Sequence, residues 1–416
     1  MDTLIRTLLL EWKDRKLPDV TKRDFSIELS ENNKVNNAIV ITGFRRVGKT
    51  YIVLEAVNKL LSKYSREEVI YLNFEDERII NPDTNLLTDL IPEAEAVFGK
   101  KPKFLFLDEL QLIPNWSKWV RRVLDSEDIK LVITGSSSKM GSSELPTELR
   151  GRAEETKIVP LNLDEFMRFK GQEKIRLPFL LNEYLIYGGL PAVVLSPEEK
   201  KLELLQSYYR TVVQREVIDR YKIKNENVLK TLLTLLINSN YITISKLFNS
   251  LKSLGLAVGK TTIDKYINNI KSSYFMEELN IFNYKIINQL MYPRKNYFVD
   301  TGFISALSTK FSKNMGRLFE NMVYQKLKTG NENIFYWKDE RDREVDFVIL
   351  EGGKVRSLYQ ACYDISDEDT FDREVKSLLR AQKVFGCDDL NLLTVEIPKN
   401  YKEIKGIKIF SVYQDG

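Results

Sequence analysis

The sequence predicts an α/β fold: a parallel β-sheet with helices on both faces, followed by a helical segment and two smaller domains. Three observations carry this prediction. Short apolar runs, each typical of a buried strand, alternate with helix-like stretches between residues 37 and 165. The first run leads directly into the pattern G-x-x-x-x-G-K-T. A later run ends in two adjacent carboxylates.

The first run, residues 38–41, is followed by the segment GFRRVGKT, which opens a helix. A strand–loop–helix order is the context in which this pattern predicts a phosphate-binding loop, the alternative being a chance glycine turn. The backbone N–H groups would surround phosphate oxygens, Lys49 would reach the β- and γ-phosphates, and the Thr50 hydroxyl would bind Mg²⁺. The residues expected to contact the nucleotide are Gly43, Phe44, Arg45, Arg46, Val47, Gly48, Lys49, Thr50 and Tyr51.

A second run, residues 68–74, reads as another buried strand, and the next one, residues 103–109, reads KFLFLDE. An apolar strand that ends in two acids is the Walker B pattern, the alternative being a strand with a polar turn. Asp108 would hold a water of the Mg²⁺ shell, and Glu109 would act as general base on the attacking water. The expected ligand and cofactor are therefore ATP and Mg²⁺, at the carboxyl ends of the strands.

The strand-like run at residues 130–134 is followed by a glycine and three serines. A small polar residue in this place can contact the γ-phosphate or the attacking water. Thr134 and Ser136 are both candidates, and an ordinary serine-rich loop is the alternative. Arg150 and Arg152 precede a last predicted strand at residues 157–161. They would stabilise transition-state charge on a neighbouring subunit's nucleotide, unless they form a solvated basic turn.

The composition narrows the chemistry further. The 416 residues carry a formal net charge of +4, with no histidine and two cysteines. Imidazole catalysis and a tetrahedral zinc site are therefore excluded. Charges interrupt the apolar N-terminal run, and no apolar run approaches the ~20 residues of a membrane span. Because Cys362 and Cys387 suit a reducing compartment, we expect a cytoplasmic protein without membrane contact.

Together, these motifs resemble those of the AAA+-like ATPases common in archaea and bacteria. The matching segments are GFRRVGKT, YLNFEDER, FLFLDELQLIPNW, ITGSSS and LRGR, then YGGLPAVV, YFVDTGF, RLFENMVYQKL and REVDFVI. The resemblance covers nearly the whole chain. It implies a winged helix and a restriction-endonuclease-like domain in the C-terminal half, and it puts Thr134 or Ser136 at the position called sensor 1. The biological role of the family is largely unassigned.

The resemblance and the sequence pattern predict five segments. They are an N-terminal helical extension (1–36), the ATPase domain (37–170), a helical lid (171–225), a winged helix (226–308) and the nuclease-like domain (309–416). In the lid we expect one long helix over residues 202–220, and in the winged helix Ser245 is a possible N-cap. The third helix of the winged helix presents Lys260, Lys265 and Lys271 to DNA phosphates, a protein-packing role being the alternative.

Active members of the nuclease-like fold place an Asp on the second strand and Glu or Gln, any residue, then Lys on the third. Asp346 and Gln360 match the first two positions, and Glu320 would help to bind metal. Cys362 stands at the lysine position, where a thiol cannot replace an ammonium. We therefore expect a degenerate nuclease fold that is kept for binding or assembly.

Three functions remain open at this point. The first is an ATPase, possible as a homo-oligomer, that acts on nucleic acid or a protein partner, with Lys49, Glu109, Arg150 and Arg152 as catalytic residues. The second is a DNA nuclease regulated by ATP. The third is a nucleotide-gated signalling or defence switch with little turnover, against which the intact Glu109 argues.

Overall fold

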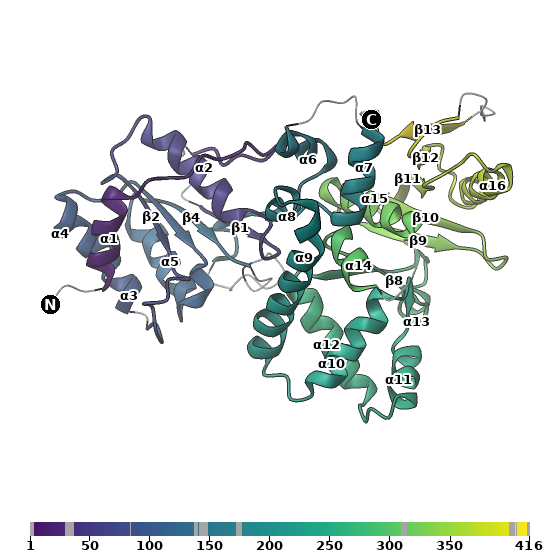
Figure 1. Cartoon of the computed structure of the whole chain (residues 1–416), viewed down its shortest axis with the longest axis horizontal. Helices are drawn as coiled ribbons and strands as arrows, with labels where there is room; N and C mark the ends of the chain where they lie inside the picture. Colours follow the sequence, from purple (N-terminus) through teal and green to yellow (C-terminus); the bar gives the residue numbers. More distant parts are fainter. Residues whose placement is uncertain are drawn as a thin grey trace. The chain divides into compact units, whose positions relative to one another are not determined.

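A computed structural model describes residues 4–29, 37–83, 85–136, 140, 149–171, 177–308, 314–398, 404 and 406–413. The chain divides into two compact units (Figure 1). Unit 1 comprises residues 1–161 with 272–274, and unit 2 comprises residues 162–271 with 275–416. The expected domain boundary at residue 309 lies outside the described residues.

Unit 1 is built around a parallel sheet of five strands in the order β2-β3-β4-β1-β5. The strands are β1 (Ala38–Gly43), β2 (Val69–Asn73), β3 (Phe104–Asp108), β4 (Lys130–Thr134) and β5 (Ala153–Ile158). The helices are α1 (Leu4–Asp14), α2 (Lys49–Leu61), α3 (Asn85–Thr88), α4 (Leu90–Phe98) and α5 (Trp116–Ser126).

The strand order decides which helix covers which face. The chain crosses the sheet in one direction from β1 to β2, and in the opposite direction from β2 through β3 to β4. Because crossovers between parallel strands are right-handed, α2 lies on one face and α4 and α5 lie on the other. Every residue of β3 and β4 is buried, as cover on both faces requires. The predicted parallel sheet with helices on both faces is confirmed.

The last strand of this sheet was predicted wrongly at residues 157–161. It runs from Ala153 to Ile158, and it pairs with β1 from Ala38 to Gly43. The strand lies at the edge of the sheet, four of its six residues are polar, and only Ile158 is buried. It therefore lacks the apolar run that predicted the other four strands.

Unit 2 begins with helices and continues into two sheets. The first helices are α6 (Leu163–Lys170), α7 (Leu177–Tyr187), α8 (Pro191–Val194) and α9 (Glu198–Val212). The predicted long helix at 202–220 is α9 continued by a π-helical segment, Val213–Asp219. No helix in the described part of the chain is both long and apolar enough to cross a membrane.

The middle of unit 2 is a small antiparallel sheet with helices around it, in the order β6-β8-β7. Its elements are α10 (Glu226–Ile237), β6 (Tyr241–Ile242), α11 (Ile244–Ser253), α12 (Lys260–Ser272), β7 (Met276–Leu279), α13 (Ile286–Met291), β8 (Arg294–Phe298) and α14 (Thr301–Leu307). The N-cap of α11 is Thr243, whose side chain accepts a hydrogen bond from Lys246 N. The expectation for Ser245 was wrong, because that residue lies one position inside the helix.

The last part of unit 2 is a mixed sheet in the order β13-β12-β11-β10-β9. Its elements are α15 (Met315–Gly330), β9 (Ile334–Lys338), β10 (Glu344–Glu351), β11 (Lys354–Ala361), α16 (Glu368–Phe385), β12 (Leu390–Thr394) and β13 (Ile407–Ser411). A bridge between Ile281 and Tyr336 joins this sheet to the small one. Phe282 enters the hydrophobic core of the mixed sheet, so the two sheets of unit 2 are packed together.

Two glycine-containing motifs of unit 2 meet at the buried side chain of Asp300. This carboxylate accepts hydrogen bonds from Gly189 N at 2.7 Å and Gly302 N at 2.8 Å. A Cβ atom on Gly188 would lie 1.6 Å from Asp300 Oδ1, and Gly188 has a φ of +76°. The segments YGGLP and VDTGF therefore contact each other at this carboxylate, and the Thr301 hydroxyl adds a hydrogen bond to Tyr184 O at 3.2 Å.

Candidate nucleotide site

The phosphate-binding loop joins β1 to α2 at the carboxyl edge of the unit 1 sheet. Gly43 and Gly48 have φ values of +138° and +97°, which favour glycine. A Cβ on Gly43 would lie 2.2 Å from Ile158 O of the neighbouring strand, so no larger residue fits there. The loop turns back over the sheet because these two glycines permit it.

The residues of the loop differ in how far they are exposed. Phe44 and Val47 are buried, whereas Arg46 and Tyr51 are exposed. Arg45 is ion-paired with Glu75, which follows β2. Only the backbone of the buried residues can face a phosphate, while the side chains of Arg46 and Tyr51 remain accessible.

The Lys49 side chain is buried against the loop. Its Nζ atom donates hydrogen bonds to Gly43 O at 3.1 Å and Phe44 O at 3.2 Å. The same ammonium lies 3.9 Å from Glu109 Oε1. It is therefore held between the loop and the end of β3, which is where phosphate charge would be neutralised.

Asp108 lies at the end of β3 among three hydroxyl groups. Thr50 Oγ1 donates to its Oδ2 atom at 2.7 Å, and Tyr71 OH donates to the same oxygen at 2.9 Å. Thr134 Oγ1 donates to the other oxygen. Burial raises the pKa of Asp108, while these hydrogen bonds favour its ionised form. Thr50 and Asp108 offer the hard oxygen atoms that Mg²⁺ prefers, so the predicted metal-binding pair is brought together.

Glu109 is held in a left-handed backbone conformation, with a φ of 56°. Its N–H donates to Thr134 Oγ1 at 3.0 Å, and its Oε2 atom accepts from Ser136 Oγ at 3.1 Å and Gln111 Nε2 at 2.5 Å. A non-glycine residue in this conformation is strained, a feature that recurs at active sites. Thr134 thus aligns the Walker B backbone, and Ser136 contacts the carboxylate expected to act as base.

The two arginines that follow β4 are placed differently. Arg150 is exposed, and Arg152 is ion-paired with Asp125 of α5. Neither of them has a contact with the loop or with Glu109 among the interactions resolved in the described residues.

Sequence reasoning missed three residues of this site. Tyr71 contacts Asp108, Gln111 contacts Glu109, and the buried Arg23 donates to Val47 O at 3.0 Å and Val159 O at 3.1 Å. Arg23 precedes β1 in a segment without periodic pattern, so nothing in the sequence indicates its partner. Tyr71 lies in an apolar strand, so from the sequence it looks like an ordinary core residue, and nothing indicates that its hydroxyl contacts Asp108.

The predicted carboxylate site of unit 2 encloses a lysine. Lys295 Nζ of β8 lies 2.8 Å from Glu320 Oε1, 2.5 Å from Glu344 Oε1 and 2.8 Å from Asp346 Oδ1, and the side chain is buried. Burial raises the pKa of Asp346 to about 7, against the effect of Lys295. In the described residues no group of three or more Asp, Glu or Cys side chains is arranged to hold a metal ion.

The other two residues of the predicted nuclease site face the same cluster. Gln360 Oε1 accepts from Asp346 N at 3.3 Å, and Cys362 Sγ donates to Asp364 O at 3.2 Å. Burial raises the pKa of Cys362 to about 11, so the thiol is neutral and cannot act as the missing ammonium. The ammonium of this site comes from Lys295, which sequence analysis did not single out.

Comparison with known families supports the assignment of unit 1. A family model described as an AAA domain matches residues 35–167. Two models described as domains of unknown function match residues 179–314 (DUF8612) and 315–385 (DUF4143). Together with the loop and sheet described above, the first match shows an AAA-type P-loop ATPase fold.

Two relatives extend the comparison over most of the chain. The "Uncharacterized protein MJ1544" of Methanocaldococcus jannaschii is 38% identical over 393 residues, which are 91% of this chain and 85% of the relative. The chain belongs to the same family as this protein. An "Uncharacterized protein" of Haemophilus influenzae is 27% identical over 355 residues, covering 84% of this chain and 88% of its own length.

Solved structures give weaker similarities. The Walker-type ATPase paby2304 of Pyrococcus abyssi is 13% identical, with a TM-score of 0.47, covering 70% of this chain and 99% of its own. The AMPPCP-bound DnaA of Aquifex aeolicus is 16% identical, with a TM-score of 0.31, covering 58% and 84%.

Proposed function

We propose that this protein binds Mg²⁺–ATP and hydrolyses it. One observation carries the proposal: Lys49, Thr50, Asp108 and Glu109 converge at the carboxyl edge of one sheet, with Thr50 Oγ1 2.7 Å from Asp108 Oδ2. Mg²⁺ bound there would neutralise charge on the β- and γ-phosphates.

Each residue then has a distinct role. The backbone of the loop binds the phosphates, and Lys49 stabilises the charge that develops between the β- and γ-phosphates. Glu109 takes a proton from the attacking water, and the hydrogen bond from Ser136 orients its carboxylate. This assignment gives the sensor role to Ser136, and it gives Thr134 the role of aligning Asp108 and Glu109.

Steady-state ATP turnover of purified variants tests this proposal. Glu109→Gln should retain nucleotide and lower kcat by about 10²- to 10⁴-fold, the range of general-base catalysis. Lys49→Ala should lose nucleotide affinity as well as turnover. Lys59→Ala is the matched control, since this lysine lies on the same helix with its side chain 47% exposed. If both site variants hydrolyse ATP as fast as the wild type, the proposal is wrong.

The trans-acting arginine is part of the same proposal. Arg150 is exposed and suits contact with a neighbouring subunit in a homo-oligomer, whereas Arg152 has an intramolecular partner in Asp125. Mixing Arg150→Ala with Glu109→Gln should restore part of the lost turnover, because some interfaces would then combine an intact arginine with an intact base. Two inactive variants that stay inactive when mixed would refute a role in trans.

We further propose that unit 2 contains a winged helix and a degenerate nuclease-like domain whose arrangement responds to ATP. The order α10-β6-α11-α12-β7-α13-β8 with the sheet β6-β8-β7 supports the first, with α13 inserted between the two strands of the wing. The order α15-β9-β10-β11-α16-β12 supports the second. The Lys295 ammonium among the carboxylates argues against DNA cleavage. Mg²⁺-dependent cleavage of plasmid DNA that Asp346→Ala abolishes would overturn this view.

Two of the three lysines predicted to contact DNA from α12 have partners within the chain. Lys271 Nζ is 2.7 Å from Glu278 Oε2, and Lys260 Nζ is 3.0 Å from Ser245 Oγ, so both have partners within the chain. Lys265 is exposed. DNA binding through α12 would therefore be weak and salt-sensitive, and charge reversal at Lys260 and Lys265 should abolish it.

A further inference from the structure

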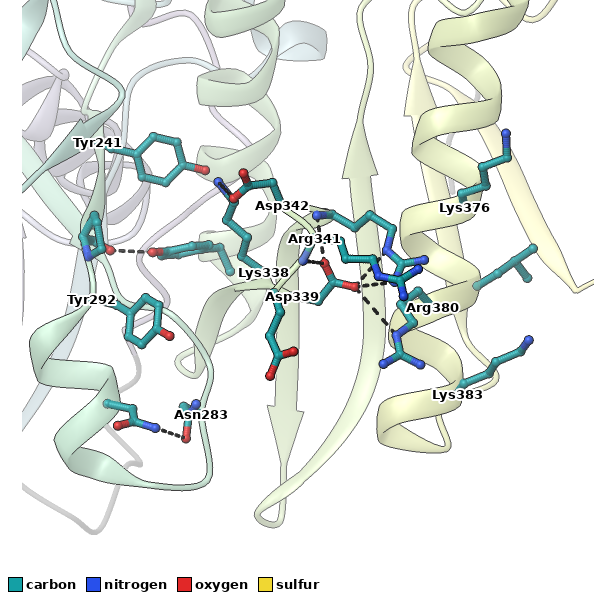
Figure 2. A pocket seen from close by; sticks show the side chains of 16 residues that line it. Tyr241, Asn283, Tyr292, Lys338, Asp339, Arg341, Asp342, Lys376, Arg380 and Lys383 are labelled. Atoms are coloured by element: carbon teal, nitrogen blue, oxygen red, sulfur yellow. Dashed lines mark hydrogen bonds and ion pairs between the residues drawn. The ribbon is translucent and has the colours of Figure 1, made fainter.

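A large groove in unit 2 lies apart from the nucleotide site. One wall comes from α13 and the start of β8, the other from α16, and the turn between β9 and β10 lies between them (Figure 2). Its volume is about 1230 Å³. Sites for small molecules usually have about 300–1,000 Å³, so this groove suits an extended ligand better.

The charge of the groove is positive. Six basic and three acidic side chains line it: Lys338, Arg341, Arg343, Lys376, Arg380 and Lys383 against Asp339, Glu340 and Asp342. Two of the acids are already neutralised from within the groove. Asp339 pairs with Arg343 at 2.7 Å and lies 3.7 Å from Arg380, and Asp342 pairs with Lys338 at 3.0 Å.

Three of the basic residues form a row along α16. Lys376, Arg380 and Lys383 are spaced by four and three residues, so they lie on one face of the helix, and all three line the groove. Figure 2 shows Arg380 directed towards Asp339. Lys376 also pairs with Asp372, but both side chains are more than half exposed, and such a pair contributes little. The row is a track for successive negative charges.

The opposite wall carries tyrosine and asparagine side chains. Tyr292 lines it and is half exposed, and Asn283 lies beside it (Figure 2). Behind them Tyr241 and Tyr336 pack edge to face at 5.8 Å. The Tyr336 hydroxyl donates to Pro293 O at 2.5 Å. The Tyr241 hydroxyl donates to Glu344. The inner rings are therefore fixed, while the ring of Tyr292 is available for stacking.

We propose that this groove binds a single strand of nucleic acid, with phosphates along α16 and bases against the wall that contains Tyr292. A positive track that faces an aromatic side chain is the arrangement that binds single strands without sequence preference. An acidic protein segment would also meet the charges, but it would have no need of the amide and tyrosine wall. The inference goes beyond ATP hydrolysis and does not depend on it.

The groove also continues towards the carboxylate cluster. Arg341, Asp342 and Arg343 line both this groove and a second cavity of about 600 Å³, which is lined in addition by Asp346 and Gln360. A strand bound along α16 would thus pass the degenerate nuclease site. Lys295 lines neither cavity, and its buried ammonium is already paired with three carboxylates, so we do not expect it to contact the strand.

Fluorescence anisotropy with a labelled mixed-sequence DNA strand of about 16 nucleotides tests the proposal, since that length fills a site of this kind. The triple variant Lys376→Glu, Arg380→Glu, Lys383→Glu should weaken binding at least tenfold and reduce the salt dependence by about two counterions. Tyr292→Ala should weaken binding about tenfold through lost stacking, and Tyr292→Phe should bind as the wild type does.

The control variant is Lys200→Glu, Lys230→Glu, Lys326→Glu, which makes the same charge change at exposed sites that do not line the groove. It should retain binding, and thermal melting should show both triple variants folded. If both triple variants lose the same amount of binding affinity, the effect comes from net charge alone and the proposal is wrong. Three other results would also overturn the proposal. They are tighter binding of a duplex of the same sequence, loss of binding only in a Lys260→Glu, Lys265→Glu variant, and no binding by the wild type.

Discussion

Asp108 in unit 1 and Asp346 in unit 2 are both buried carboxylates on a sheet, yet their surroundings differ. Asp108 is contacted by the neutral hydroxyls of Thr50, Tyr71 and Thr134. Asp346 is contacted by the ammonium of Lys295. Hydroxyl groups hold a carboxylate in place without neutralising it, so Asp108 can still attract a cation from solution. At Asp346 the positive charge is instead supplied by Lys295 of the same chain.

The largest expected effect comes from removing the internal cation. Lys295→Met leaves Glu320, Glu344 and Asp346 buried without a positive charge, and breaking such a buried pair typically costs about 3–5 kcal/mol. We expect the free energy of unfolding in urea to fall by this amount at pH 7, and by less at acidic pH, where the carboxylates can take up protons.

Lys49→Met gives the matched change in unit 1. It should abolish ATP turnover with a smaller loss of stability, because Lys49 mainly contacts backbone carbonyls. If Lys49→Met and Lys295→Met lose the same amount of stability, the two lysines do not differ in the way proposed here. Full stability of Lys295→Met would show that its carboxylates become neutral without cost.

The second prediction uses Asp300, a buried carboxylate that has neither hydroxyl nor ammonium partners in the hydrogen bonds resolved for it. Gly188→Ala would push a methyl group into Asp300 Oδ1, 1.6 Å away, and should destabilise unit 2 by about 3 kcal/mol or more. Gly255→Ala is the matched control. Its φ is +75°, with no atom near the added Cβ, so only the left-handed conformation is penalised, by about 1–2 kcal/mol.

Chemical denaturation of the two glycine variants measures this difference. A larger loss in Gly188→Ala than in Gly255→Ala supports the tight contact around Asp300. Equal losses would mean that the YGGLP and VDTGF segments separate readily, and that Asp300 does not hold them together.

Much of unit 1 follows from its sequence, because its signals are local. The glycines of the loop and the acids after β3 are adjacent in the chain to the elements that position them. Lys295 is different, since it lies 25 residues from Glu320 and 51 from Asp346. Its strand has charged and polar neighbours at 294 and 296, so no pattern indicates that the ammonium is buried. Only the packing of the two sheets of unit 2 brings the cluster together.

The third prediction is a pH dependence of stability that comes from Asp300 and that an Asp300 variant isolates. Burial raises the pKa of Asp300 to about 6, against hydrogen bonds from Gly189 and Gly302. A carboxyl with a raised pKa in the folded state stabilises the fold below its unfolded pKa of 3.8, and this contribution is lost as the pH rises through about 6. The loss is on the order of 3 kcal/mol at most.

Asp300→Asn removes this titration. The unfolding free energy of the variant relative to the wild type should therefore increase between pH 4 and pH 7, as seen in urea titrations at several pH values. A difference that stays constant with pH would show that the backbone N–H groups of Gly189 and Gly302 keep Asp300 ionised throughout.

The smallest expected effect concerns the two polar residues after β4, between which the sequence did not choose. Ser136→Ala removes one hydrogen bond to Glu109, worth about 1 kcal/mol, and should lower kcat about fivefold with little change in KM. Thr134→Val removes contacts to Asp108 and to Glu109 N. It should therefore also raise the Mg²⁺ concentration needed for half-maximal turnover. Mg²⁺ titrations of ATPase activity in both variants distinguish these roles. If Ser136→Ala changes the Mg²⁺ requirement and Thr134→Val does not, the two assignments must be exchanged, and the hydroxyl groups around Asp108 would be less important for holding a cation than we infer.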